Sequence, residues 1–148
     1  MPLIFLSDDF FTTTFQGSEY YLPKMNHQTN VKAFQEICQQ KGGYLVEINT
    51  EEEYTHLLGF LNTSIPHERP NVMLGATDSS KEGDWVYMTS GKPVSIIRWF
   101  EGYEERLRRG ETYSCMYLIF GENEGMHDWL CHRNQSTRFV CEKDTGKQ

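Results

Sequence analysis

The sequence lacks the features of a membrane protein and of a nucleic-acid-binding protein. Its 148 residues contain no apolar run that approaches the roughly 20 residues needed to cross a bilayer. Lys and Arg together number 14 against 21 Asp and Glu, so the net charge is −7. Proteins that bind nucleic acid or anionic lipid are normally basic. We therefore predict no membrane span and no nucleic-acid partner.

Motifs of catalysis are also missing. The chain contains no helical zinc-protease motif, no glycine-rich phosphate loop and no nucleophile elbow. Its five histidines are scattered along the chain. We therefore predict that the protein is not an enzyme.

What the sequence does contain is enough chain for a single domain. A length of 148 residues suits one domain with its own hydrophobic core. Aromatic residues make up 14% of the chain, whereas disordered chains are poor in them. We therefore predict one globular domain over residues 1–148.

The four cysteines are Cys38, Cys115, Cys131 and Cys141. No two of them have the close spacing of a zinc knuckle. They can form disulfides in three arrangements, and four reduced thiols in a cytosolic core are the alternative. Glycosylation motifs at Asn62 and Asn134 favour secretion. Residues 1–6 are too short for a signal peptide, so we interpret the sequence as a mature or recombinant form of a secreted protein.

Two stretches place apolar residues at helical spacing. Gly42-Gly43 ends the first, and Thr50-Glu51-Glu52-Glu53 before the second is a capping box. The apolar residues of the two stretches are Val31, Phe34, Ile37 and Cys38, then Tyr54, Leu57, Leu58 and Leu61.

Short segments rich in β-branched and aromatic residues predict strands. They span residues 10–22, 44–48, 72–74, 85–88, 95–99, 115–120 and 138–141. Two helices followed by many short strands and long loops predict an α+β fold.

Several segments, in one order along the chain, carry a resemblance to a known family. They are Gly42-Gly43-Tyr44-Leu45-Val46-Glu47-Ile48, Met73-Leu74-Gly75-Ala76-Thr77-Asp78, Glu82-Gly83-Asp84-Trp85, Gly91-Lys92-Pro93-Val94, Arg98-Trp99-Phe100-Glu101-Gly102, Met126-His127-Asp128 and Phe139-Val140-Cys141-Glu142. Over about residues 15–143 the chain resembles a C-type lectin-like domain. The segment Gly91-Lys92-Pro93-Val94 is similar to the same segment of secreted invertebrate members. The resemblance implies the short form of the domain. It also implies nested disulfides, Cys38–Cys141 and Cys115–Cys131, and a long loop region, about 78–114, that usually carries ligand binding.

The resemblance also locates a sugar-binding calcium site, from which this chain departs. The family's calcium-binding tripeptide falls on Tyr103-Glu104-Glu105, its glutamate on Tyr113, and its Asn-Asp pair on His127-Asp128. Phenol and imidazole are poor ligands for a hard cation. Only Glu105 and Asp128 remain as side-chain ligands, so we expect a degenerate calcium site.

Other residues of the same loops offer contacts without calcium. Trp129, Tyr103 and Tyr113 suit stacking on a sugar or anchoring of a protein. Arg106 opens a basic cluster, residues 106–109, that suits anionic glycans or an acidic protein. The alternative is a solvated loop neutralised by its glutamates. The resemblance also implies an accessory calcium site in the same loops, where Asp78 and Glu82 keep the spacing of two ligands but Arg106 and Ser114 replace two acids. We therefore expect Asp78 to cap a turn and Glu82 to be solvated.

Some family members bind calcium away from the sugar, and that site matches Glu47, Asn49, Glu53 and Glu142. Three carboxylates and an amide carbonyl suit a hard cation that stabilises the fold. The alternative is that Glu53 only completes the capping box while the other acids face water.

We therefore predict a secreted recognition protein that binds a glycan or glycoprotein. The predicted contacts are Tyr103, Glu104, Glu105, Arg106, Tyr113, His127, Asp128 and Trp129. The alternative is a protein-binding module without calcium-dependent sugar binding. With all four cysteines paired in the nested scheme, any oligomer is non-covalent, and assembly would add avidity.

Overall fold

The computed structural model of the chain describes residues 9–66, 71–100 and 113–146. Within these ranges the fold is α+β, as predicted, with helices α1 (Val31–Gln40) and α2 (Glu51–Ser64). The strands are β1 (Phe10–Phe15), β2 (Ser18–Pro23), β3 (His27–Thr29), β4 (Tyr44–Leu45), β5 (Asn71–Thr77), β6 (Val86–Tyr87), β7 (Cys115–Ile119), β8 (Gly125–Trp129), β9 (Gln135–Phe139) and β10 (Cys141–Asp144). Neither helix in this part of the chain is long and apolar enough to cross a membrane.

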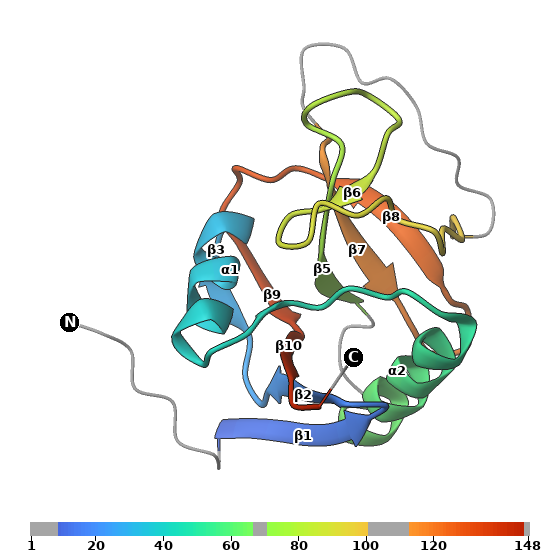
Figure 1. Cartoon of the computed structure of the whole chain (residues 1–148). Helices are drawn as coiled ribbons and strands as arrows, with labels where there is room; N and C mark the ends of the chain where they lie inside the picture. Colours follow the sequence, from blue (N-terminus) through green and yellow to red (C-terminus); the bar gives the residue numbers. More distant parts are fainter. Residues whose placement is uncertain (1–8, 67–70, 101–112, 147–148) are drawn as a thin grey trace.

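The strands form two sheets. One has the order β1-β2-β10-β4, and the other has the order β3-β9-β5-β7-β8 with β6 paired to β5. Only β5 and β9 pair in parallel among the named strand pairs. Figure 1 shows β1, β2 and α2 at one end of the molecule and β6 near the opposite end. The strands nearest the two termini, β1, β2 and β10, therefore share one sheet, remote from the loop region.

The first predicted strand, residues 10–22, is a hairpin of two strands. Gln16 and Gly17 connect β1 to β2 with φ values of 46° and 83°. Two consecutive residues with positive φ form the type of turn that matches the twist of paired strands. The turn lies inside an aromatic-rich stretch, so composition alone does not locate it.

The first predicted helix is confirmed as α1. The side chain of Asn30 accepts a hydrogen bond from the Ala33 amide, which caps the first turn. The predicted apolar stripe is buried. Gly42 ends the helix with a φ of 84°, and a side chain at Gly43 would collide with the Glu142 carbonyl.

The second predicted helix is confirmed as α2. The Thr50 hydroxyl accepts a hydrogen bond from the Glu53 amide at 3.0 Å. The Glu53 carboxylate accepts from the amide of Asn49, at 2.8 Å. It therefore reaches one residue beyond the Thr50 amide that a capping box would use. The second oxygen of Glu53 is used elsewhere, as described below.

Two strand predictions are wrong. Only residues 44–45 of the predicted strand 44–48 pair as β4. Residues 95–99 form no strand, and Trp99 makes an isolated bridge to Met126. Backbone hydrogen bonds join Met126 to Arg98 and Phe100, which attaches this segment to the edge of β8. The predicted strand 138–141 is divided between β9 and β10.

The nested disulfides are confirmed. Cys38 joins Cys141 with an S–S distance of 2.03 Å, and Cys115 joins Cys131 at 2.02 Å. The first bond links α1 to β10 within one hydrophobic core cluster. A second core cluster includes Trp85 and is packed by Trp99.

Candidate functional site

The structure places three of the predicted ligand residues on one strand. His127, Asp128 and Trp129 belong to β8, and Tyr113 lies two residues before β7. Tyr103, Glu104, Glu105 and Arg106 lie outside the described residues. The site is therefore built here from β7, β8 and the end of β5, which together we call the loop end.

Alternation along β8 separates the predicted ligands. Met126 and Asp128 are buried, whereas His127 and Trp129 are half-buried. Successive side chains of a strand point to opposite faces of the sheet. The two rings therefore stand on the outer face of the strand, and the carboxylate of Asp128 lies on the inner face.

Four aromatic side chains, Tyr113, Tyr117, His127 and Trp129, form what we call the aromatic cluster. The ring centroid of Trp129 lies 6.1 Å from Tyr113, 6.0 Å from Tyr117 and 6.4 Å from His127. Tyr117 and His127 are 5.3 Å apart. All four are half-buried. Trp129 meets Tyr113 and His127 edge to face, and the other two pairs are tilted. Aromatic pairs are each favourable by about 0.5–1.5 kcal/mol, so the rings fix one another.

Tyr117 is the member that sequence reasoning did not select. It lies directly opposite His127 in the β7–β8 ladder, while Cys115 lies opposite Trp129. Cross-strand neighbours of this kind have side chains on the same face. Burial raises the pKa of the Tyr117 phenol, so the hydroxyl stays neutral near pH 7. The register of β7 against β8 would have revealed it, and only pairing supplies that register.

The ring of His127 is oriented by its own strand. Its Nδ1 atom lies 2.7 Å from the carbonyl oxygen of Asp128. A carbonyl only accepts hydrogen bonds, so Nδ1 carries the proton in this contact. Nδ1 also lies 3.7 Å from Oδ1 of Asp128, so the imidazole ring lies beside the buried carboxylate.

Two buried carboxylates, Asp78 and Asp128, lie beneath the outer face. They are 2% and 1% exposed. Burial raises the pKa of Asp128 to about 6, and the negative charge of Asp78 adds to the increase. Asp78 accepts a hydrogen bond from the Gly83 amide at 2.9 Å, so the prediction that it caps a turn is confirmed. Its other oxygen hydrogen-bonds to no residue in the described ranges.

These residues do not make a calcium site by themselves. Calcium takes about six to eight oxygen ligands. Within residues 9–66, 71–100 and 113–146, no three His, Cys, Asp or Glu residues are grouped as a metal site. The residues described at the loop end offer the carboxylates of Asp78 and Asp128, and Glu82 is exposed in the turn. This part of the sugar-calcium ligand set does not fit the ion.

The second candidate calcium site lies at the other end of the molecule, which we call the scaffold end. Glu47, Glu53 and Glu142 are 5%, 4% and 0% exposed. The alternative, that Glu47 and Glu142 face water, is therefore wrong. Burial raises the pKa of Glu47.

Each of these carboxylates accepts hydrogen bonds from the protein. Glu142 accepts from the Ser18 hydroxyl at 2.6 Å and from the Glu47 amide at 3.2 Å. The second oxygen of Glu53 accepts from the Tyr20 hydroxyl at 2.5 Å. Glu47 accepts from the Ser90 amide at 3.1 Å. The donor types suit calcium, but these oxygens already have partners in the protein.

The chain matches known proteins over most of its length. Residues 27–143 match the family of the lectin C-type domain. The chain is 28% identical to a perlucin-like protein of Mytilus galloprovincialis over 104 residues, or 70% of this chain and 64% of that protein. It is 28% identical to salivary C-type lectin 2 of Aedes albopictus over 115 residues, or 73% of each chain. The chain thus spans less than two thirds of the mussel protein.

Solved structures share the fold. The carbohydrate-recognition domain of the human scavenger receptor C-type lectin superposes with a TM-score of 0.73 and 24% identity, over 90% of this chain and 95% of that one. Human lithostathine superposes with a TM-score of 0.72 and 22% identity, over 90% and 88% of the two chains. At these identities the likeness concerns the fold.

Proposed function

Because the chain belongs to the lectin C-type domain family, we propose that it is a secreted, non-enzymatic recognition protein that binds a glycan at the loop end. The aromatic cluster is the single observation that carries the proposal. Aromatic rings with partly accessible faces stack on the apolar faces of sugars. The cluster includes three residues predicted as ligand contacts from the sequence, Tyr113, His127 and Trp129.

Secretion is supported by the chemistry of the cysteines. Both disulfides join pairs within the chain, and such bonds persist in oxidising compartments. The mosquito relative is named a salivary lectin, in keeping with this assignment. One structural neighbour, a Kupffer cell lectin receptor, is described as trimeric. We propose that any assembly of this chain is non-covalent, since its four cysteines are used internally.

For calcium, we propose a structural role at Glu47, Asn49, Glu53 and Glu142. The donor types, three buried carboxylates and an amide carbonyl, support a hard cation there. Within residues 9–66, 71–100 and 113–146 these carboxylates are not grouped as a metal site and accept hydrogen bonds from the protein, so calcium would have to replace some of those donors. Of the two side-chain ligands that remain at the predicted sugar site, Asp128 lies in β8 and Glu105 lies outside the described residues. We therefore assign the ion to stabilisation of the fold and leave ligand contact to the aromatic cluster.

A glycan array tests the proposed function. The purified protein is applied to the array in calcium and again in EDTA, beside a Met25→Ala control, which alters an apolar residue 74% exposed between β2 and β3. We expect a reproducible glycan signal that the control variant retains. Absence of any signal in both buffers would contradict glycan binding.

The second candidate function is binding of a protein ligand. Clustered Tyr and Trp side chains also anchor protein partners. An empty array would favour this function, and the same Trp129 surface would then be the one to test against protein ligands.

A further inference from the structure

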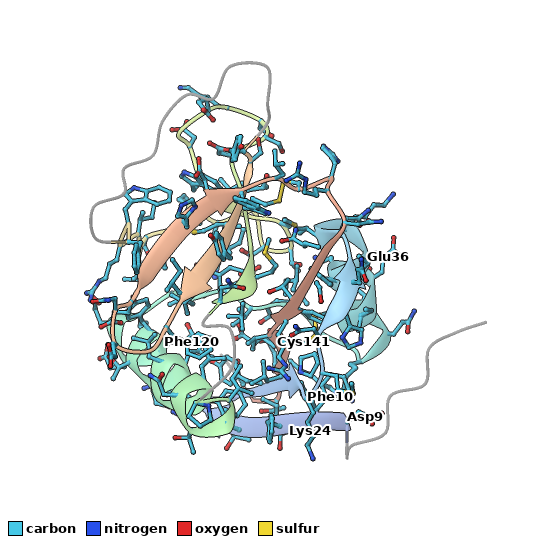
Figure 2. All side chains as sticks on the ribbon, turned by 180° about the vertical axis from the view of Figure 1, so that it is seen from behind. Asp9, Phe10, Lys24, Glu36, Phe120 and Cys141 are labelled. Atoms are coloured by element: carbon cyan, nitrogen blue, oxygen red, sulfur yellow. A yellow bond between two sulfur atoms is a disulfide. The ribbon has the colours of Figure 1, made fainter. Side chains whose placement is uncertain are left out.

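The outer face of strands β7 and β8 carries no Asp, Glu, Lys or Arg side chain. On β7 this face presents Tyr117 and Ile119, and on β8 it presents His127 and Trp129. Seen from behind, in Figure 2, neither helix lies in front of β7 and β8. A surface of rings without Asp, Glu, Lys or Arg favours a neutral ligand with an apolar face of its own.

The angles between the rings add a shape requirement. Trp129 is inclined by 83° to Tyr113, 60° to Tyr117 and 65° to His127. A flat ligand that stacks on one of these rings therefore meets the edges of its neighbours. Those edges carry two phenol hydroxyls, an indole N–H and an imidazole, which donate to and accept from hydroxyl groups. A pyranose ring has this combination of a C–H face and equatorial hydroxyls.

The buried carboxylates cannot supply the usual metal contact from this face. Asp128 is 1% exposed, and its Oδ1 lies 3.7 Å from Nδ1 of His127, so the carboxylate is covered by the protein rather than presented to a ligand. No metal group forms among the described residues. In the described part of the loop end, a ligand would therefore contact aromatic rings rather than a bound metal ion.

We propose that the aromatic cluster binds a neutral pyranoside by stacking, without calcium, and that Tyr117 is one of its contact residues. This inference rests on the proposed glycan-binding function and specifies its chemistry. Calcium then contributes to folding alone, and removal of calcium leaves the sugar contacts in place.

Agarose-bound galactose, mannose and N-acetylglucosamine, used in EDTA, test the inference. We expect the protein to bind at least one of these resins in EDTA and to be eluted by the matching free sugar. Tyr117→Ala should weaken binding by about tenfold, the loss of one ring contact. Tyr117→Phe keeps the ring and should stay within about threefold of the unmodified protein.

A second variant keeps the test valid if Tyr117→Ala is poorly folded, because Tyr117 also packs against the core. Trp129→Ala should weaken binding to the same resin by at least about tenfold, with Met25→Ala as the matched control. Circular dichroism and melting curves show which variants are folded.

The outcomes separate the two proposals. Binding that disappears in EDTA, or that survives both Tyr117→Ala and Trp129→Ala, overturns stacking at the cluster and leaves glycan recognition intact. Failure to bind any resin or array glycan, with or without calcium, overturns glycan recognition itself.

Discussion

The two ends of the molecule bury acidic side chains in different ways. At the scaffold end, Glu142 and Glu53 accept hydrogen bonds from hydroxyl and amide groups of the protein. At the loop end, burial raises the pKa of Asp128, and the negative charge of nearby Asp78 adds to the increase. A satisfied buried carboxylate stabilises the fold, whereas adjacent buried carboxylates oppose it. At the scaffold end too, burial and then the charge of Glu142 raise the pKa of Glu47. The difference teaches that the scaffold end is distinguished by the hydrogen bonds that join its carboxylates to distant parts of the chain, not by an absence of neighbouring charge.

The disulfides give the largest expected contrast between the two ends. Cys38–Cys141 closes a separation of 103 residues and Cys115–Cys131 a separation of 16. Replacing the first pair by alanine should lower the free energy of unfolding by roughly 4–5 kcal/mol, and the second by roughly 3 kcal/mol. Urea denaturation of both double variants measures this. Equal losses would remove the contrast.

Glu142→Ala should give the next largest effect. It deletes the acceptor of the Ser18 hydroxyl and the Glu47 amide, leaving buried donors unsatisfied. We expect a loss of roughly 2–4 kcal/mol in the free energy of unfolding. The exposed Glu36→Ala serves as control and should change stability by less than about 0.5 kcal/mol. A similar small change in Glu142→Ala would show that its hydrogen bonds contribute little.

Asp128→Asn should instead raise the free energy of unfolding at neutral pH. The folded pKa is about 6 against an ordinary value of 3.8, so the folded protein binds more protons between these values. Stability should therefore be greatest below about pH 4 and fall as the pH rises to about 6. Above that range Asp128→Asn should be more stable by roughly 1–3 kcal/mol.

Chemical denaturation of both proteins from pH 3.5 to pH 7.5 checks this prediction. The variant should lack the slope that the unmodified protein shows between about pH 4 and pH 6. Parallel curves across that range would contradict the raised pKa of Asp128.

Bound calcium should give the smallest change in stability of those predicted here. At ten times its dissociation constant, a structural calcium would add about 1.4 kcal/mol. We expect the melting temperature to rise in millimolar calcium, with the rise lost in Glu142→Gln and kept in Asp128→Asn. Loss of the rise in Asp128→Asn alone would place the ion at the loop end. An unchanged melting temperature in the unmodified protein would contradict a structural calcium.

The scaffold end could largely be predicted from the sequence. Local signals, such as the stripe from Val31 to Cys38 and the Thr50 cap, act within one helix turn, so spacing reveals them. The order of the family segments supplied the disulfide pairs. The strand predicted at residues 95–99 failed because alternation cannot show whether a partner strand is present. In the described part of the chain, the backbone hydrogen bonds of this segment to β8 are confined to Arg98 and Phe100, which bond to Met126.

The loop end was predicted only in part. His127 and Trp129 were selected by position, but Tyr117 depends on the register between β7 and β8. The burial of Glu142 could not be predicted from the sequence either. A buried carboxylate depends on hydrogen-bond donors that are distant along the chain, such as Ser18, 124 residues away. Such contacts leave no local pattern.

The nested disulfides have a consequence for proteolysis. A single cut within residues 101–112 falls inside the span closed by Cys38–Cys141 and outside the ring closed by Cys115–Cys131. The two fragments would stay joined through Cys38–Cys141, and β2 would still pair with β10. A cleaved molecule would migrate as one species until it is reduced. The aromatic cluster lies wholly on the carboxyl-terminal fragment, so a nicked protein would retain its four rings.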